Sequence, residues 1–299
     1  MRAWSTARWS VPLPDGHRFP MGKYRMVREG IVAAGVLPES AIHEPERIGR
    51  DQLALVHGAR YIDAVADGTL TEAELRRLGF PWSPLLPERS FRTVQGTLEA
   101  CRDALDRGAG INLAGGTHHA FPDHGEGYCV FNDVAVAIRV LERDGRIRRA
   151  VVIDLDVHQG NGTARIFDGD PDVFTFSVHG ARNYPFRKER SRLDVELPDG
   201  CADAEYLDRL DRHLDPVLEE AEPDLAVYIA GADPYHGDRL GRLGLSIEGL
   251  AARDARVFDA CARRRIPVAM VLGGGYATRL EDLVTIHANT VRELLSRHG

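Results

Sequence analysis

Three alternate side chains near the middle of the chain are of the types that bind divalent metal ions. Asp154, Asp156 and His158 follow an apolar run at spacings of two. Side chains two apart in an extended chain point to the same side, so Asp156 and His158 can both bind the same ion. Asp154 can support them one step deeper on that side. Carboxylates at the end of a buried strand are costly without a partner, so we expect a cation or a dense hydrogen-bond network there. Asp233, after another apolar run, is the candidate third ligand.

Two aspartates and one histidine suit a divalent metal that keeps open positions for water and substrate. His118 and His119 form a doublet after a glycine-rich turn. Metal-bound water has a pKa of about 7, which a histidine base matches. One histidine can deprotonate that water while the other stays charged or donates a proton. The alternatives are a hydrogen-bonded turn for the aspartates and a core role for either histidine.

Tyr276 follows the glycine triplet 273–275. The triplet lacks the GxGxxG order of a dinucleotide site. A phenol on such a loop can donate its O–H to a developing oxyanion. Packing in the core is the alternative for this tyrosine.

The elements that must position these residues read as strands alternating with helices. We expect buried parallel strands over 111–114, 150–155, 173–178, 225–230 and 267–272. We expect helices over 93–107, from an N-cap at Asn132 to before Gly145, and over 206–221, 247–265 and 279–297. The alternation favours an α/β fold in one domain, 1–299, with an open, mostly parallel sheet flanked by helices on both faces. Ligands bind beyond the carboxyl ends of such strands, where all the candidate residues fall.

The segment Leu78–Ser90 carries three prolines. Because proline disfavours both a regular helix and a central strand, we expect a long loop, either a lid or rim of the site or a surface excursion without a task. Loop position puts Pro81–Trp82 and Asn183–Tyr184 near the entrance of the site.

The composition is that of a globular protein, with 43% hydrophobic and 28% charged residues among 299. Lys+Arg number 38 against 45 Asp+Glu, and this net charge of −7 argues against a partner among nucleic acids or anionic membranes. Four widely spaced cysteines without a CxxC pair indicate free thiols in a reducing compartment. With no apolar run of about 18 residues and no signal peptide, we expect no membrane span and a cytoplasmic location.

Five motifs occur in the order found in one known family. They are HRFPMGKY (17–24), GGTHHAFPDHGEGYCVFND (115–133), VVIDLDVHQGNGT (151–163), AGADPYHGDRLGRL (230–243) and LGGGY (272–276). Together they resemble the metal-dependent histone deacetylase family, on the arginase/deacetylase fold, and most closely its bacterial and class IV-like members. The resemblance implies a hydrolase that uses metal-activated water to remove acetyl or other acyl groups from acylated lysine or a related amine.

The resemblance also implies roles for single residues. Asp156, His158 and Asp233 match the family's zinc ligands, and ferrous iron is a second metal that such ligands hold. His119 matches the general base, and Tyr276 matches the phenol that polarises the substrate carbonyl.

Further matches concern the surroundings of the metal. His118 matches a histidine paired with the buried Asp154, while Asn161 takes the place of the aspartate that partners the second histidine in class I. An asparagine holds a positive imidazole less strongly than a carboxylate does. The resemblance implies a substrate tunnel at Tyr128, Gly127 and Gly274, and a structural potassium site at Asp154, Asp156, His158, Ser177 and Val178.

Three alternative functions stay open at this point. The first is hydrolysis of acetylpolyamines or another small acylated amine on the same fold. The second is the two-manganese chemistry of arginases, which want a DxHxD pattern, whereas Gly160 stands in the place of the extra ligand. The third is a catalytically silent protein that binds acylated lysine.

Overall fold

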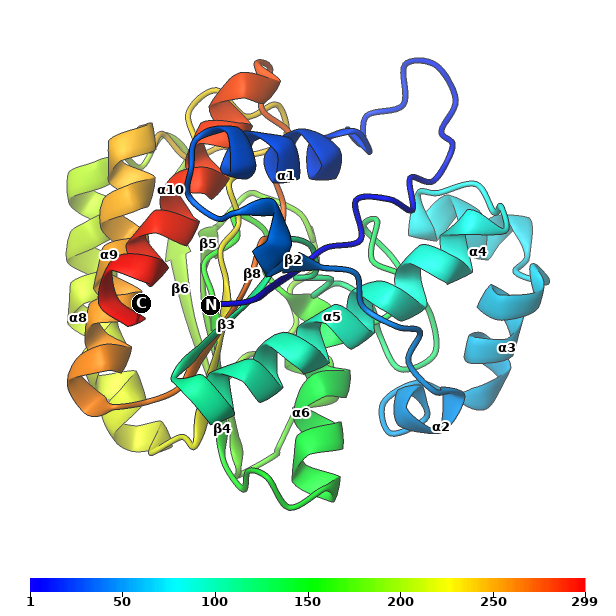
Figure 1. Cartoon of the computed structure of the whole chain (residues 1–299), viewed down its shortest axis with the longest axis horizontal. Coiled ribbons are helices and arrows are strands. Elements are labelled where there is room, and N and C mark those ends of the chain that lie inside the picture. Colours follow the sequence, from blue (N-terminus) through cyan, green and yellow to red (C-terminus); the bar gives the residue numbers. More distant parts are fainter. Residues whose placement is uncertain (299) are drawn as a thin grey trace.

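One sheet of eight parallel strands forms the centre of the computed structural model, which describes residues 1–298 (Figure 1). The strand order is β2-β1-β3-β8-β7-β4-β5-β6. The strands are β1 (Ala3–Trp4), β2 (Ile42–His43), β3 (Ala109–Asn112), β4 (Ala150–Asp154), β5 (Val173–Gly180), β6 (Leu193–Leu197), β7 (Leu225–Ile229) and β8 (Val268–Val271). The predicted fold class is therefore confirmed, and every pair of neighbouring strands is parallel.

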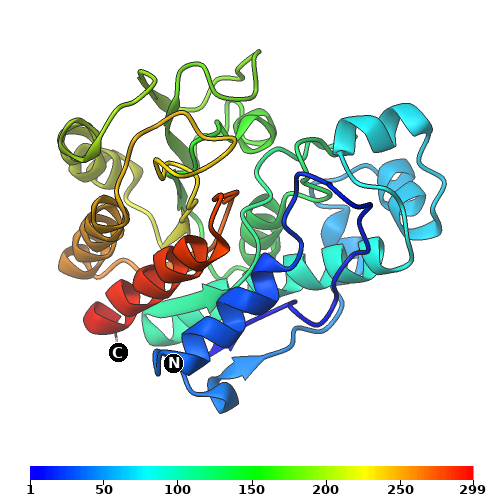
Figure 2. The same cartoon turned by 90° about the horizontal axis from the view of Figure 1, so that it is seen from above.

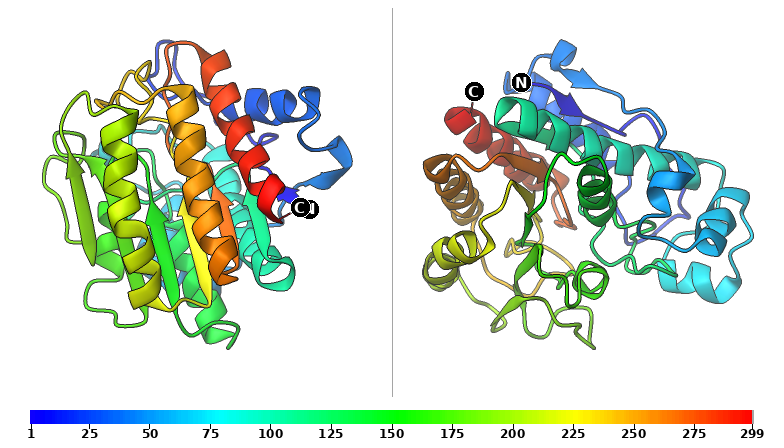
Figure 3. Two further views of the ribbon diagram at one scale, coloured as in Figure 1. Left: turned by 90° about the vertical axis from the view of Figure 1, so that its left-hand side faces the viewer. Right: turned by 90° about the horizontal axis from the view of Figure 1, so that it is seen from below.

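Helices cover both faces of the sheet. On one face lie α8 (Asp203–Ala221), α9 (Ile247–Arg264) and α10 (Leu280–His298), side by side in Figure 3. Helix α1 (Lys23–Ala33) packs along α10 (Figure 2). The other face is covered by α5 (Leu85–Arg107) and α6 (Asp133–Arg143), with α7 (Asn161–Ile166) beside α6. The short elements η1 (Glu39–Ala41), α2 (Arg50–Leu53), α3 (Ala59–Asp67) and α4 (Glu72–Leu78) complete the chain.

Side chains along each central strand alternate between two cores. On β4, Val151 and Ile153 belong to the core under α8, α9 and α10, whereas Ala150 and Val152 belong to the core under α5 and α6. A strand buried on both faces needs apolar residues at every position, because neither face meets water. This is why the sequence shows continuous apolar runs at the central strands.

The parallel register brings the carboxyl ends of the central strands together. Asp154, the last residue of β4, pairs with Ser177 on β5 and with Ile229 on β7. Ile229 in turn pairs with Val271, the last residue of β8. The loops that follow β4, β7 and β8 therefore leave the sheet at one edge.

The expected long loop at Leu78–Ser90 is wrong, because α5 already begins at Leu85. Pro84 is its N-cap and Pro87 lies in its first turn, where a missing N–H breaks no intrahelical bond. The indole N–H of Trp82, in the short connection before α5, donates to the carbonyl of Val65 on α3 at 2.9 Å. Trp82 therefore packs on α3, and neither Pro81 nor Trp82 lines the pocket that opens onto the site.

Two predicted helix ends are confirmed. The Asn132 side chain caps α6 by accepting from the Ala135 N–H, and α5 ends at Arg107 before Gly108, whose φ is +91°. All four cysteines are free and buried. No helix within residues 1–298 has the length and apolar character needed to cross a membrane.

His57 is a buried histidine that joins the segment after α2 to the start of α6. The Asn132 N–H donates to its Nε2 at 3.0 Å, so Nδ1 carries the proton and donates to the Phe121 carbonyl at 3.0 Å. Burial lowers the pKa of His57 to about 4. The folded protein therefore requires the neutral ring.

We expect the His57 contribution to stability to be complete above pH 6.5 and to decline as the pH falls toward 4, because only the unfolded chain binds the proton readily in that range. Between pH 7 and pH 5 this loss is about 2 kcal/mol in the free energy of unfolding. Denaturant unfolding at both pH values measures it. His57→Gln should be less sensitive to acid than the wild type, whereas His213→Gln, on the outer helix α8, should match the wild type. Equal sensitivity of the His57 variant and the wild type would contradict the assignment.

Candidate active site

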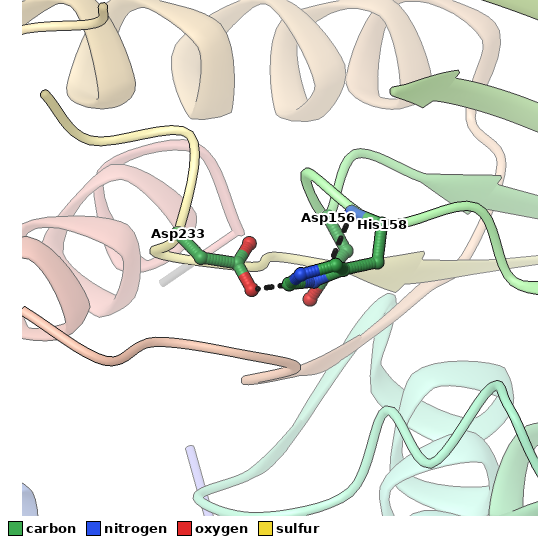
Figure 4. Close-up of side chains that lie close together, drawn as sticks. All are labelled: Asp156, His158 and Asp233. Atoms are coloured by element: carbon green, nitrogen blue, oxygen red, sulfur yellow. Dashed lines mark hydrogen bonds and ion pairs between the residues drawn. The ribbon is translucent and has the colours of Figure 1, made fainter. Parts of the chain in front are cut away.

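Asp156, His158 and Asp233 meet at the edge where β4 and β7 end (Figure 4). Each offers one ligand atom, and the three atoms lie within 4.8 Å of one another. His158 Nδ1 is 3.0 Å from Asp156 Oδ1 and 3.2 Å from Asp233 Oδ2. All three side chains are buried. The structure thus brings together the three residues that the sequence singles out as metal ligands.

The charges of this group favour a cation. Burial and the charge of Asp156 raise the pKa of Asp233, while its Oδ2 has no partner with hydrogen-bond geometry and its Oδ1 accepts from the Val157 N–H at 2.9 Å. Burial opposes charge on His158, but Asp156 and Asp233 outweigh it and raise the pKa to about 10. In the chain by itself, the positive charge between these two carboxylates is a proton on His158. A divalent metal would balance both carboxylates and satisfy the orphaned oxygen, so the donor set fits such an ion.

Gly274 lets the backbone approach the two carboxylates. Its N–H donates to Asp156 Oδ2 at 2.7 Å. A Cβ at this position would overlap Asp233 Oδ2 and lie 2.7 Å from Asp156 Oδ2. Gly274 therefore lies at the candidate metal group, and it lines the small interior cavity beside it rather than the outer pocket.

The surroundings favour one metal ion over two. A Cβ at Gly160 would overlap Asp154 Oδ2 and lie 3.1 Å from the His118 side chain, so no extra ligand fits there without displacing both. Within the described part of the chain, Asp156, His158 and Asp233 form the one group of three close ligand atoms.

The two neighbouring histidines have different partners and different charges. His118 Nδ1 lies 2.7 Å from Asp154 Oδ2. Burial opposes its charge, but Asp154 and Asp156 raise the pKa of His118 to about 9. His119 Nδ1 lies 2.7 Å from Asn161 Oδ1, and burial together with the charge of His118 holds the pKa of His119 well below its ordinary value. The pair thus consists of one charged and one neutral ring.

Glu126 and Tyr184 complete the hydrogen bonds around His119, and sequence reasoning missed Glu126. Glu126 Oε1 accepts from Asn161 Nδ2 at 2.6 Å and from the Tyr184 O–H at 2.8 Å. The Tyr184 ring stands edge-on to His119, with 4.9 Å between centroids. Because Asn161 donates with Nδ2, its Oδ1 faces His119 and accepts from Nδ1–H, which leaves His119 Nε2 free. The available sequence signal was the asparagine itself, which needs a partner to orient its amide.

Tyr276 is held by its backbone, whose N–H donates to Asp238 Oδ2 at 2.6 Å. Its ring centroid lies 6.4 Å from that of His158, and burial raises the pKa of the phenol well above its ordinary value, so the O–H is a donor. Sequence reasoning also missed Lys23. Its side chain is buried, with Nζ 5.2 Å from the Tyr276 ring centroid and 3.3 Å from the Gly275 carbonyl oxygen.

A pocket of about 550 Å³ opens onto the site. His119, His158 and Tyr276 lie on it, and Gly127, Tyr128, Asn183 and Tyr184 line its wall. Gly127 has a φ of +56°, and a Cβ there would lie 2.7 Å from the His119 ring. The two predicted tunnel residues 127 and 128 and the predicted entrance residues 183 and 184 therefore border this pocket.

The predicted potassium residues lie around the ends of β4 and β5. Asp154 and Ser177 are register partners, with Val178 next along β5, and Asp154 and Ser177 line a cavity of about 10 Å³. Asp156 and His158 belong to the candidate metal group. Potassium binding stays a prediction.

Comparisons with known proteins place this chain in a family. The family model named Histone deacetylase domain matches residues 17–291, and the chain therefore belongs to the histone deacetylase family. The class of enzyme that this membership indicates is a deacetylase hydrolase.

Individual relatives agree with this assignment. The chain is 45% identical over 278 residues to an uncharacterized protein of Picosynechococcus sp., covering 93% of each. It is 32% identical to histone deacetylase 2 of Arabidopsis thaliana, covering 95% of this chain and 74% of the relative. A solved histone deacetylase homologue from Aquifex aeolicus shares the fold, with a TM-score of 0.85 and 22% identity over 99% of this chain and 84% of the other.

We expect the purified protein to bind one divalent metal ion per chain. The described residues hold one group of three ligand atoms, and no side chain fits at Gly160 to bind a second ion. Metal analysis after dialysis measures the ratio. Asp233→Ala should lose the ion, whereas Asp168→Ala, an exposed aspartate outside the site, should retain it. Two tightly bound ions per chain would contradict this expectation and favour the two-metal alternative.

Proposed function

We propose that this protein is a zinc-dependent hydrolase that removes acyl groups from acylated lysine. The observation that carries the proposal is the buried group Asp156, His158 and Asp233, whose His158 lines one pocket together with His119 and Tyr276. A solved histone deacetylase homologue in complex with SAHA, with a TM-score of 0.84, shares this fold and supports the proposal. Ferrous iron is the second metal that these ligands suit.

Asp156, His158 and Asp233 would hold the zinc ion. When bound, it supplies a Lewis acid that polarises the acyl carbonyl and lowers the pKa of a bound water to about 7. His119, neutral and with Nε2 free, takes a proton from the attacking water. Tyr276 donates its O–H to the carbonyl oxygen as negative charge develops.

The remaining proton transfer completes an amide hydrolysis. The bond between the acyl carbon and the lysine nitrogen breaks, and a histidine of the pair protonates the departing nitrogen. The products are a carboxylate and a free amine. His118 contributes a fixed positive charge, held by its contact with Asp154.

We also propose a structural potassium ion at the ends of β4 and β5, bound by Asp154 and Ser177 and by carbonyl groups of Asp156, His158 and Val178. The four free thiols support a cytoplasmic location. Nucleic acids and membranes are not proposed as partners.

We expect the zinc-loaded protein to release acetate from acetyl-lysine peptides and to lose this activity on chelation. His119→Ala and Tyr276→Phe should each lower kcat by about 100-fold or more, because the first removes the base and the second an oxyanion donor. Product quantification by chromatography measures both effects. Full activity in either variant would contradict the roles, and tight peptide binding without turnover by the wild type would favour the silent binder.

We expect Glu126→Ala to lower kcat by about 10-fold with little change in KM, because the Asn161 amide loses the acceptor that orients it toward His119. Glu126→Gln should retain more activity, since its amide oxygen can still accept from Asn161. Steady-state kinetics of each variant measure the effect, with Glu219→Ala on the exposed face of α8 as control.

The Asn161→Asp background separates this orienting role from a structural one. There residue 161 no longer donates to Glu126, and two carboxylates would face each other. Removal of Glu126 should then leave kcat unchanged or raise it. An equal loss of kcat in both backgrounds would contradict the orienting role.

A further inference from the structure

The mouth of the active-site pocket carries a charge opposite to that of the whole chain. Six arginines line it: Arg18, Arg76, Arg77, Arg182, Arg239 and Arg242. No aspartate or glutamate is among the lining residues, although the chain as a whole has 45 acidic and 38 basic residues. Arginine makes up nearly all the basic residues of this chain, so the evidence lies in where these six gather rather than in their type.

Several of these positive charges are not balanced within the protein. Within residues 1–298, no carboxylate lies within 4.0 Å of the guanidinium groups of Arg18, Arg77 or Arg239. Arg182 and Arg242 share the single carboxylate of Asp199, at 4.0 and 3.2 Å. Like charges gathered around a concave opening repel one another, and the field they produce is concentrated in the opening. An anionic ligand would relieve this repulsion.

We propose that the substrate is an acyl-lysine set among acidic side chains of a peptide or protein segment. This inference rests on the proposed function, because the arginines surround the pocket that leads to His119 and Tyr276. Carboxylates beside the acyl-lysine would pair with the mouth arginines while the acyl chain enters the pocket. A polyamine or a lysine flanked by basic residues would meet repulsion at the same place.

The distribution of the arginines favours a peptide over a small acylated acid. They come from four separate segments: the loop before α1, helix α4, the loop after β5 and the loop after β7. A ligand with a single carboxylate can engage one of these segments, whereas acidic side chains on both sides of an acyl-lysine can engage several. Phe186, on the same rim, has 89% of its surface exposed and offers an apolar contact to a peptide backbone laid across the mouth.

The test compares zinc-loaded enzyme on three acetyl-lysine peptides of equal length, with flanking aspartates, flanking glycines or flanking arginines, and on free acetyl-lysine. We expect kcat/KM for the acidic peptide to exceed that for the basic peptide by about 10-fold or more at low salt, and the ratio to shrink at high salt. Free acetyl-lysine should be the poorer substrate relative to the acidic peptide.

Charge reversal assigns the effect to the mouth. Arg77→Glu combined with Arg182→Glu should reverse or abolish the preference, while Arg209→Glu on α8, outside the pocket, should keep it. Equal turnover of acidic, neutral and basic peptides would overturn this inference and leave the proposed function standing. Turnover of free acetyl-lysine above the acidic peptide would overturn the choice of a peptide. Absence of turnover on every substrate would overturn the proposed function and the inference with it.

Discussion

Two buried carboxylates that face each other at the end of a parallel sheet are the constraint on which the site depends. Asp156 and Asp233 each have one oxygen fixed by a backbone N–H, from Gly274 and Val157 respectively, and each directs the other oxygen toward His158. Leaving such groups uncompensated in the interior costs several kcal/mol, roughly, for each ion. The backbone therefore holds an anionic pair in place, and a cation is what the arrangement requires.

Two neighbouring histidines at the same edge of the sheet differ in their hydrogen-bond partners and in their charge. They are adjacent in sequence and similar in burial, yet one faces a carboxylate and the other an amide. The Asp154 carboxylate holds a proton on His118, while Asn161 accepts from His119 without stabilising a second charge as strongly. The nearest carboxylate on this side is that of Glu126, which accepts from the Asn161 amide and so lies one hydrogen bond further from the His119 ring. Asn161 therefore orients His119, and Glu126 in turn orients Asn161.

The sequence predicts the parts of this arrangement that follow from local pattern. Continuous apolar runs mark the central strands, and the polar residues directly after β4 and β7 mark the ligand edge, since parallel strands end together. Short strands such as β1 and β2, with two residues each, carry no periodic pattern and were missed. The expectation of a loop at the start of α5 was wrong because proline disfavours the interior of a helix but is tolerated at its N-cap and in its first turn, where Pro84 and Pro87 lie.

Longer-range contacts account for what the sequence left open. Glu126 reaches Asn161 across 35 positions, and the mouth arginines come from four segments spread between residues 18 and 242. The tertiary fold alone assembles them.

We propose that the buried ligand group makes this chain a hydrolase of acylated lysine. Mass spectrometry of the products tests this proposal when the zinc-loaded protein acts on an acetyl-lysine peptide in water labelled with heavy oxygen. We expect one free lysine for each acetate formed, with label in the acetate. Peptide bound but recovered intact, or acetate released without the label, would contradict it.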